Sequence, residues 1–203
     1  MNSATPLRLQ QQIAFICEID RLKTVLRQTL LMDASRQENS AEHSWHLALM
    51  ALTLAEYAPE GTDLERAIKQ LLLHDLVEID AGDTFCYDAA ANLDKAEREA
   101  QAAKRLFGLL PEDQGEEMRS LWEEFEAQAT PTAKFAAALD RIQPLLHNQR
   151  TQGGTWKKHG ITRDQVMKRM APVATGAPAL WPFVLQIIEE CCAAGLIAAE
   201  AIR

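Results

Sequence analysis

Apolar residues recur every three or four positions along almost the whole chain, and no segment alternates apolar and polar residues for long enough to suggest a sheet. This spacing places apolar side chains on one face of an α-helix, which turns about every 3.6 residues. The chain has 203 residues, 47% of them hydrophobic, which is enough for one domain with a substantial core. We therefore expect an all-α fold, a single helical bundle over residues 1–203.

The expected helices are bounded by capping residues, glycines and prolines. They cover about residues 7–28, 40–58, 62–79, 92–108, 112–128, 131–147, 162–172 and 178–201, with Ser40 and either Thr62 or Asp63 as N-caps. Pro144 should kink or shorten the sixth helix. Residues 148–160, which contain two adjacent glycines, are expected to form a long loop and a candidate flap. The last helix is apolar on more than one face, so it should be buried or form an oligomer interface.

Charge and composition restrict the partners. A formal net charge of -8 argues against binding of nucleic acid polymers or anionic membranes by bulk electrostatics. Residues 1–12 do not resemble a secretory signal, and no segment approaches the ~20 apolar residues of a membrane helix. The four cysteines lack CxxC spacing and are expected to be reduced and mostly buried. We expect a cytoplasmic protein.

A polar pair interrupts the most apolar part of the third expected helix. His74 and Asp75 lie within residues 71–78, Leu-Leu-Leu-His-Asp-Leu-Val-Glu. Burying a carboxylate beside an imidazole is costly unless both are paired, and a metal ion would pair them most completely. Glu78 follows one helical turn later and can reach the same side of the helix.

Two distant residues extend this candidate site. His43 begins an apolar helix, and Asp140 is flanked by apolar residues in the sixth expected helix. Each histidine alone would more often be a hydrogen-bonded core or surface residue. Together, two imidazoles and two carboxylates form a mixed nitrogen and oxygen set that suits a divalent ion with open positions for water. Such an ion lowers the pKa of bound water and polarises a phosphoryl oxygen.

The order of His43, His74-Asp75 and Asp140 resembles the H…HD…D pattern of the HD-domain metal-dependent phosphohydrolase superfamily. Residues 38–44, 74–83, 121–126 and 134–140 are similar to its 5′-deoxynucleotidase branch, which includes HD domain-containing protein 2. The resemblance covers about residues 19–147. It implies an all-helical HD domain. We expect helices 162–201 to pack on this domain or to form an oligomer interface.

The resemblance also implies a reaction and a cofactor. The reaction is hydrolysis of the 5′-phosphate of deoxynucleoside monophosphates with one divalent ion, which would be Mn, Co, Fe, Mg or Zn. The positions that match the metal ligands are His43, His74, Asp75 and Asp140. Glu78 matches the acid that orients or deprotonates water, and Asp83 matches a second acid that lies toward the sugar. An arginine before the first histidine holds the phosphate in that branch, and here this would be Arg27 or Arg36.

We therefore expect a metal-dependent 5′-nucleotidase that acts on a small-molecule nucleotide and forms a homodimer. Gln28 follows Arg27 where bacterial members of the branch often have tryptophan, which leaves the base and sugar preference open. One alternative is an HD phosphohydrolase for a cyclic nucleotide, an alarmone or a nucleoside triphosphate. Another is a non-catalytic metal or nucleotide sensor.

The remaining histidines are expected outside the site. His46 shares a helix face with His43 but matches no ligand of the family, so its expected role is structural. His147 and His159 are expected to be exposed to solvent. Trp156, in the expected loop, is a candidate to cover a bound base.

Overall fold

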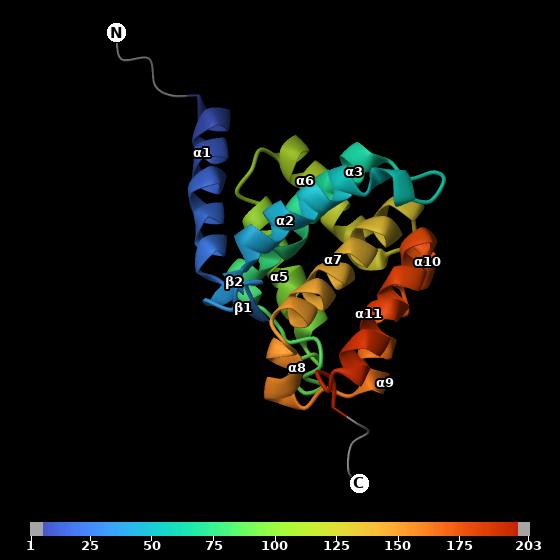
Figure 1. Ribbon diagram of the computed structural model, residues 1–203. Coiled ribbons are helices and arrows are strands. Elements are labelled where there is room, and N and C mark those ends of the chain that lie inside the picture. Colours follow the sequence, from blue (N-terminus) through green and yellow to red (C-terminus); the bar gives the residue numbers. More distant parts are fainter. Residues whose placement is uncertain (1–5, 199–203) are drawn as a thin grey trace.

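A computed structural model of the protein describes residues 6–198 as a bundle of helices with one small two-stranded sheet (Figure 1). The α-helices are α1 (Leu7–Ile19), α2 (Ser40–Thr53), α3 (Leu64–Leu73), α4 (Glu78–Ala81), α5 (Lys95–Phe107), α6 (Glu112–Ala127), α7 (Pro131–Arg150), α8 (Gly154–His159), α9 (Arg163–Met170), α10 (Val173–Gly176) and α11 (Trp181–Ala193). The 3-10 turns are η1 (Asp20–Thr24), η2 (Ala55–Tyr57), η3 (His74–Val77) and η4 (Pro178–Leu180). Strands β1 (Leu26–Leu30) and β2 (Gln37–Asn39) pair antiparallel. The predicted all-α fold class is confirmed.

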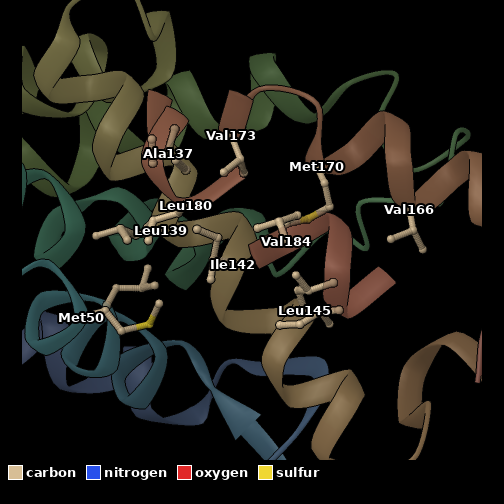
Figure 2. Close-up of a cluster of buried hydrophobic side chains, with 14 of the residues drawn as sticks. Met50, Ala137, Leu139, Ile142, Leu145, Val166, Met170, Val173, Leu180 and Val184 are labelled. Atoms are coloured by element: carbon tan, nitrogen blue, oxygen red, sulfur yellow. The ribbon is translucent and has the colours of Figure 1, made fainter. Parts of the chain in front are cut away.

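Helix α7 is the central element of the bundle and contacts α2, α3, α6, α9, α10 and α11. Figure 2 shows Leu139 and Ile142 of α7 gathered with Met50 of α2 and Val184 of α11 in one apolar cluster. Full burial of each such side chain contributes about 1.5–3 kcal/mol. Asp140 lies next to Leu139 in the chain, so apolar packing fixes the helix turn that carries it.

A second apolar cluster lies around α5, α6 and η3. It contains Leu106 of α5, Trp122 of α6 and Leu76 of η3. Leu71, at the end of α3, belongs to the first cluster. The His74-Asp75 segment is therefore held from two sides, by Leu71 before it and Leu76 after it.

The prediction of a first helix over residues 7–28 is wrong beyond Ile19, where α1 ends. The chain turns through η1 and enters β1, where pairing with β2 satisfies backbone groups that a longer helix would have bonded internally. The apolar stripe of α1 is also not part of the core, since Ile13 and Ile16 are 50% and 57% exposed. Figure 1 shows α1 along one side of the molecule, and Phe15 anchors it in the second cluster.

The predicted loop over residues 148–160 is also wrong. Helix α7 continues through Pro144 to Arg150, so the proline does not shorten it, and α8 fills most of the remaining segment. Trp156 is only 3% exposed, and Thr155 Oγ1 donates a hydrogen bond to the carbonyl of Gln28 in β1 at 3.0 Å. Gly153, with φ of +86°, allows the tight turn between the two helices. The segment is a packed part of the fold and not a flap.

The C-terminal helices pack onto the bundle. Helix α11 buries Val184, Ile187, Ile188 and Cys191 in the first cluster, while Phe183 is 47% exposed. It ends at Ala193, earlier than predicted, and predicted helical positions 199–201 lie outside the described residues.

Cys17 and Cys86 are exposed, contrary to the expectation of mostly buried thiols. Within residues 6–198 no helix is both long and apolar enough to cross a bilayer.

Candidate metal centre

The four predicted metal ligands come from three elements and meet at one point. His43 lies on α2, His74 and Asp75 on η3, and Asp140 on α7. The Nε2 atom of His43 lies 3.0 Å from Asp140 Oδ1, and the Nε2 atom of His74 lies 3.1 Å from Asp75 Oδ1 and 3.7 Å from Asp140 Oδ1. One ligand atom each from His43, His74 and Asp140 lies within 4.8 Å of the others.

The histidine-aspartate pair lies where the third helix changes type. The sequence predicts one helix to Ile79, whereas α3 ends at Leu73 and tightens into the 3-10 turn η3 before α4 resumes. Asp63, one of the two predicted caps, begins α3 by accepting a hydrogen bond from Arg66 N at 3.0 Å. A 3-10 segment inside a longer helix often marks a functional position.

Hydrogen bonds determine which histidine nitrogens face the centre. The Nδ1–H group of His74 donates to the carbonyl of Leu71 at 2.9 Å, and because a carbonyl only accepts, the lone pair of Nε2 faces the site. On the other imidazole, Nδ1 of His43 lies 3.5 Å from Glu38 Oε2, which leaves Nε2 toward Asp140. In the described structure His74 Nε2 is buried without a hydrogen-bond partner. A divalent ion among these atoms would satisfy that nitrogen, so the residues fit the metal that the family implies.

The surrounding charges also favour a cation at this point. Burial alone would raise the pKa of Asp140, but the neighbouring imidazoles of His43 and His74 hold it well below its usual value. Burial alone would lower the pKa of His74, yet the charges of Asp75 and Asp140 raise it to about 9. An added positive charge is therefore stabilised between these carboxylates.

Glu78 and Asp83 line the same cavity as His74, Asp75 and Asp140. Burial, together with the charge of Asp75, raises the pKa of Glu78 well above its usual value. Burial likewise raises the pKa of Asp83. Ser40, predicted as an N-cap, is instead the first residue of α2, and Asn39 caps the helix by accepting from Glu42 N at 3.0 Å.

This one-residue difference releases the Ser40 hydroxyl from a capping role. Its Oγ donates to Glu78 Oε2 at 2.6 Å. The hydrogen bond orients a carboxyl group that burial keeps protonated to higher pH than an exposed glutamate. Glu78 is therefore placed to exchange a proton within the cavity.

Only one of the two arginines that were expected to bind phosphate lines this cavity. Arg27 lines the cavity from β1, and its Nη1 donates to Asp75 Oδ2 at 2.6 Å. Burial would lower its pKa, but the charges of Asp75, Glu78 and other acids outweigh burial and raise it. Arg36 is instead exposed, binds Glu42 through both Nη atoms and lines a different surface cavity. The geometry therefore does not bring Arg36 to the centre.

The cavity has a volume of about 210 Å³, and part of its wall comes from the C-terminal third of the chain. Trp156 of α8 lines it as a buried wall residue, and Arg169 of α9 reaches Asp140 Oδ2 with a 3.5 Å hydrogen bond from Nη2. Lys95 of α5 also lines the cavity. Sequence reasoning missed Arg169 and Lys95 because no local pattern distinguishes them from exposed charged residues of an amphipathic helix.

The remaining histidines fall partly as expected. His159 is exposed, as predicted, with its ring centroid 4.5 Å from that of Phe85. His147 was expected in solvent but is buried, because α7 packs against β1 and its Nδ1–H donates to the Leu30 carbonyl at 2.7 Å. His46 is half-buried, and its ring centroid lies 5.6 Å from that of His147.

The part of the chain that carries these residues is similar to known proteins. Residues 19–181 match the HD domain family. The 5′-deoxynucleotidase HDDC2 of Bos taurus is 33% identical over 153 residues, which cover 72% of this chain and 73% of that protein. The Homo sapiens protein of the same name is 31% identical over 135 residues, which cover 66% and 65%. A crystal structure of a predicted metal-dependent phosphohydrolase from Magnetospirillum magnetotacticum MS-1 is 53% identical with a TM-score of 0.92, over 98% of this chain and 100% of that one.

We expect Asp140→Asn, Asp75→Asn and His74→Ala each to lower the bound Mn²⁺ or Co²⁺ by about one equivalent per chain, because each removes a donor from the same ion. Equilibrium dialysis followed by elemental analysis measures this, and circular dichroism checks that helical content is kept. Asp20→Asn, at an exposed position in η1, is the matched control and should bind like the parent protein. Unchanged metal content in Asp140→Asn would contradict the assignment.

Proposed function

The chain belongs to the HD domain family, and on this basis we propose that it is a metal-dependent 5′-nucleotidase that releases phosphate from deoxynucleoside monophosphates. The observation that carries the proposal is the convergence of His43, His74, Asp75 and Asp140 beside a cavity that also holds a protonatable acid and basic side chains. The relatives named 5′-deoxynucleotidases support the substrate class.

The reaction divides between a metal ion and the residues of the chain. A divalent ion held by the four predicted ligands would lower the pKa of a water molecule and neutralise charge on the phosphate. We propose that Glu78, whose pKa is raised by burial, transfers a proton to the 5′-oxygen as the phosphorus–oxygen bond breaks. Ser40 keeps that carboxyl group in position. Asp83 lies on the same wall, where we propose that it contacts the sugar.

Two arginines are proposed to recognise the phosphate. Arg27 is buried and bonded to Asp75, so it positions that ligand as well as presenting charge to the cavity. The side chain of Arg169 is 35% exposed and has a long, 3.5 Å contact with Asp140, which leaves its guanidinium group available to an incoming anion. A guanidinium group binds phosphate through two parallel hydrogen bonds. We propose that Arg169 makes these bonds, and Arg36 has no part in the site.

The size of the cavity favours a mononucleotide over an alarmone or a nucleoside triphosphate. At about 210 Å³ it is smaller than the roughly 300–1,000 Å³ typical of small-molecule sites. An alarmone or a nucleoside triphosphate carries additional phosphate groups that would need further basic residues. A non-catalytic sensor would not need a carboxyl group with a raised pKa, such as that of Glu78, beside the ligand cluster.

We expect phosphate release from deoxynucleoside monophosphates in the presence of Mn²⁺ or Co²⁺, measured against ribonucleotides, cyclic nucleotides, an alarmone and triphosphates. Glu78→Gln should lower kcat by about 10²–10⁴, the usual contribution of a general acid or base, while metal content is retained. Glu123→Gln, at an exposed position on α6, is the matched control. Ligand-induced stabilisation without phosphate release would favour the sensor, and preferred turnover of another phosphate ester would favour that alternative.

We expect Arg169→Ala to raise KM for the monophosphate by about 10–100-fold, since a lost charge-assisted hydrogen bond costs about 1.5–3 kcal/mol. Lys168→Ala is the matched control, because Lys168 is exposed on the same helix and does not line the cavity described above. Steady-state kinetics measure the KM of both variants and of the parent protein. Equal KM values for the two variants would remove Arg169 from phosphate recognition.

We also propose that the protein forms a homodimer. Two helices expose apolar stripes with the same spacing, Leu9, Ile13 and Ile16 on α1 and Trp45, Leu49 and Leu52 on α2. Contiguous exposed apolar side chains commonly mark interfaces. Because α11 buries its apolar face within the bundle, α1 now carries this proposal in place of the last helix.

Light scattering coupled to size-exclusion chromatography tests the dimer. We expect the parent protein to elute as a dimer and Ile13→Glu as a monomer, because a charge in the stripe would lose its hydration on association. Leu93→Glu is the control, since Leu93 is 88% exposed and lies outside both stripes. A monomeric parent protein would refute the dimer, and a dimeric Ile13→Glu variant would exclude the α1 stripe.

A cytoplasmic location is proposed on the chemistry of the thiols. All four cysteines are free, and Cys17 and Cys86 are exposed. Exposed free thiols are common where thiols are kept reduced and uncommon in oxidising compartments.

A further inference from the structure

A second group of ligand-type residues lies behind His43, outside the cavity proposed for the nucleotide. It consists of Glu38 on β2, His46 on α2 and His147 on α7, each with one ligand atom within 4.8 Å of the others. Glu38 is 1% exposed and His147 is 3% exposed, so neither is an ordinary solvated side chain. The family resemblance assigns no ligand among these three residues.

The hydrogen bonds around His147 use only one of its two ring nitrogens. Its Nδ1–H group is used by the Leu30 carbonyl at 2.7 Å, so a neutral ring presents the Nε2 lone pair to the group. This Nε2 atom lies 3.9 Å from Glu38 Oε1 and, among the described residues, is buried without a hydrogen-bond partner. A lone pair that faces a carboxylate is repelled by it, and either a proton on Nε2 or a metal ion bound between the two atoms removes this repulsion.

Gln143 provides a possible fourth donor. Its side-chain Nε2 donates to Glu38 Oε1 at 2.5 Å and lies 3.3 Å from His46 Nδ1, while its Oε1 is buried and, in the described part of the chain, unpaired. Rotation of the amide by half a turn would replace the N–H donor with the carbonyl oxygen, which can bind a cation. The group would then offer two imidazole nitrogens, one carboxylate oxygen and one amide oxygen.

We propose that Glu38, His46 and His147 form a second metal site, with Gln143 Oε1 as a fourth ligand, that takes a transition-metal ion such as Zn²⁺. Two histidines and one carboxylate are a common ligand set for zinc and neighbouring first-row ions. Glu38, His46 and His147 also line a separate surface cavity, which gives an ion access without passage through the nucleotide cavity.

This second site has a structural consequence for the first. Its ligands join strand β2 and helix α2 to the central helix α7. Glu38 also belongs to the surroundings of His43, since its Oε2 atom lies 3.5 Å from His43 Nδ1 while its Oε1 atom faces His147. An ion bound by Oε1 would therefore hold the carboxylate that orients a ligand of the first ion.

Metal counting distinguishes the two sites, because each can be removed separately. We expect the parent protein to bind two equivalents of Zn²⁺ or Co²⁺ per chain, and His46→Gln and His147→Gln to bind one each. His159→Gln, which removes an exposed histidine, is the matched control and should bind two. Equilibrium dialysis with elemental analysis measures the stoichiometry, and circular dichroism checks folding. His46 is half-buried, so its variant serves if His147→Gln fails to fold.

A thermal measurement in the Asp140→Asn background tests the second site without the first. Zn²⁺ at 100 times its Kd should raise the unfolding free energy of Asp140→Asn by about 2.7 kcal/mol and so raise its Tm. The double variant Asp140→Asn/His46→Gln should show no such shift. One equivalent in the parent protein, or an unchanged stoichiometry in His46→Gln, would overturn the second site while leaving the proposed nucleotidase intact. A parent protein that binds two equivalents but releases no phosphate from any nucleotide would overturn the proposed nucleotidase and leave the second site intact.

Discussion

The structure depends on the burial of opposite charges where α2, η3 and α7 meet. Asp75 and Asp140 are withdrawn from water there, and buried carboxylates are tolerated only when cations or hydrogen-bond donors compensate them. Arg27 supplies part of this compensation through its 2.6 Å bond to Asp75. Arg27 belongs to strand β1, so the extended segment that follows η1 brings this compensating charge to η3. A metal ion held by the four predicted ligands would add further positive charge to this balance.

The residues that hold the metal ligands in place and the residues that line the open part of the cavity come from different parts of the bundle. The ligand-bearing turns are held by the two apolar clusters, because Leu71, Leu76 and Leu139 flank the ligands in sequence and are buried. The side chains that face the open part of the cavity, such as Arg169, come from helices added after α7. Residues of α8 and α9 can therefore be exchanged without removing any of the four predicted metal ligands, which lie on α2, η3 and α7.

The sequence predicted what depends on local periodicity and ordered motifs. The pair His74-Asp75 and its separation from Glu78 are local, and the order of His43 and Asp140 around them indicated that they would converge. Long-range packing was not predictable in the same way. The sequence predicts a surface position for His147 because nothing nearby in the chain shows that β1 covers it. Residues 148–160 were read as a loop because of two glycines, although Trp156 is buried and Gly153 only turns the chain between helices.

Pro144 shows how the site and the helix constrain each other. It lies four residues after Asp140, so the carbonyl of that proposed ligand has no N–H donor in the helix. Such a proline inside a helix costs about 3 kcal/mol, yet α7 continues to Arg150. The helix persists because Leu139, Ile142 and Leu145 are buried on both sides of the interruption. Pro144 itself lines the nucleotide cavity, so the break in the hydrogen-bond ladder lies in the turn that presents Asp140. The apolar core thus stabilises a local defect at the position where the chemistry is proposed to occur.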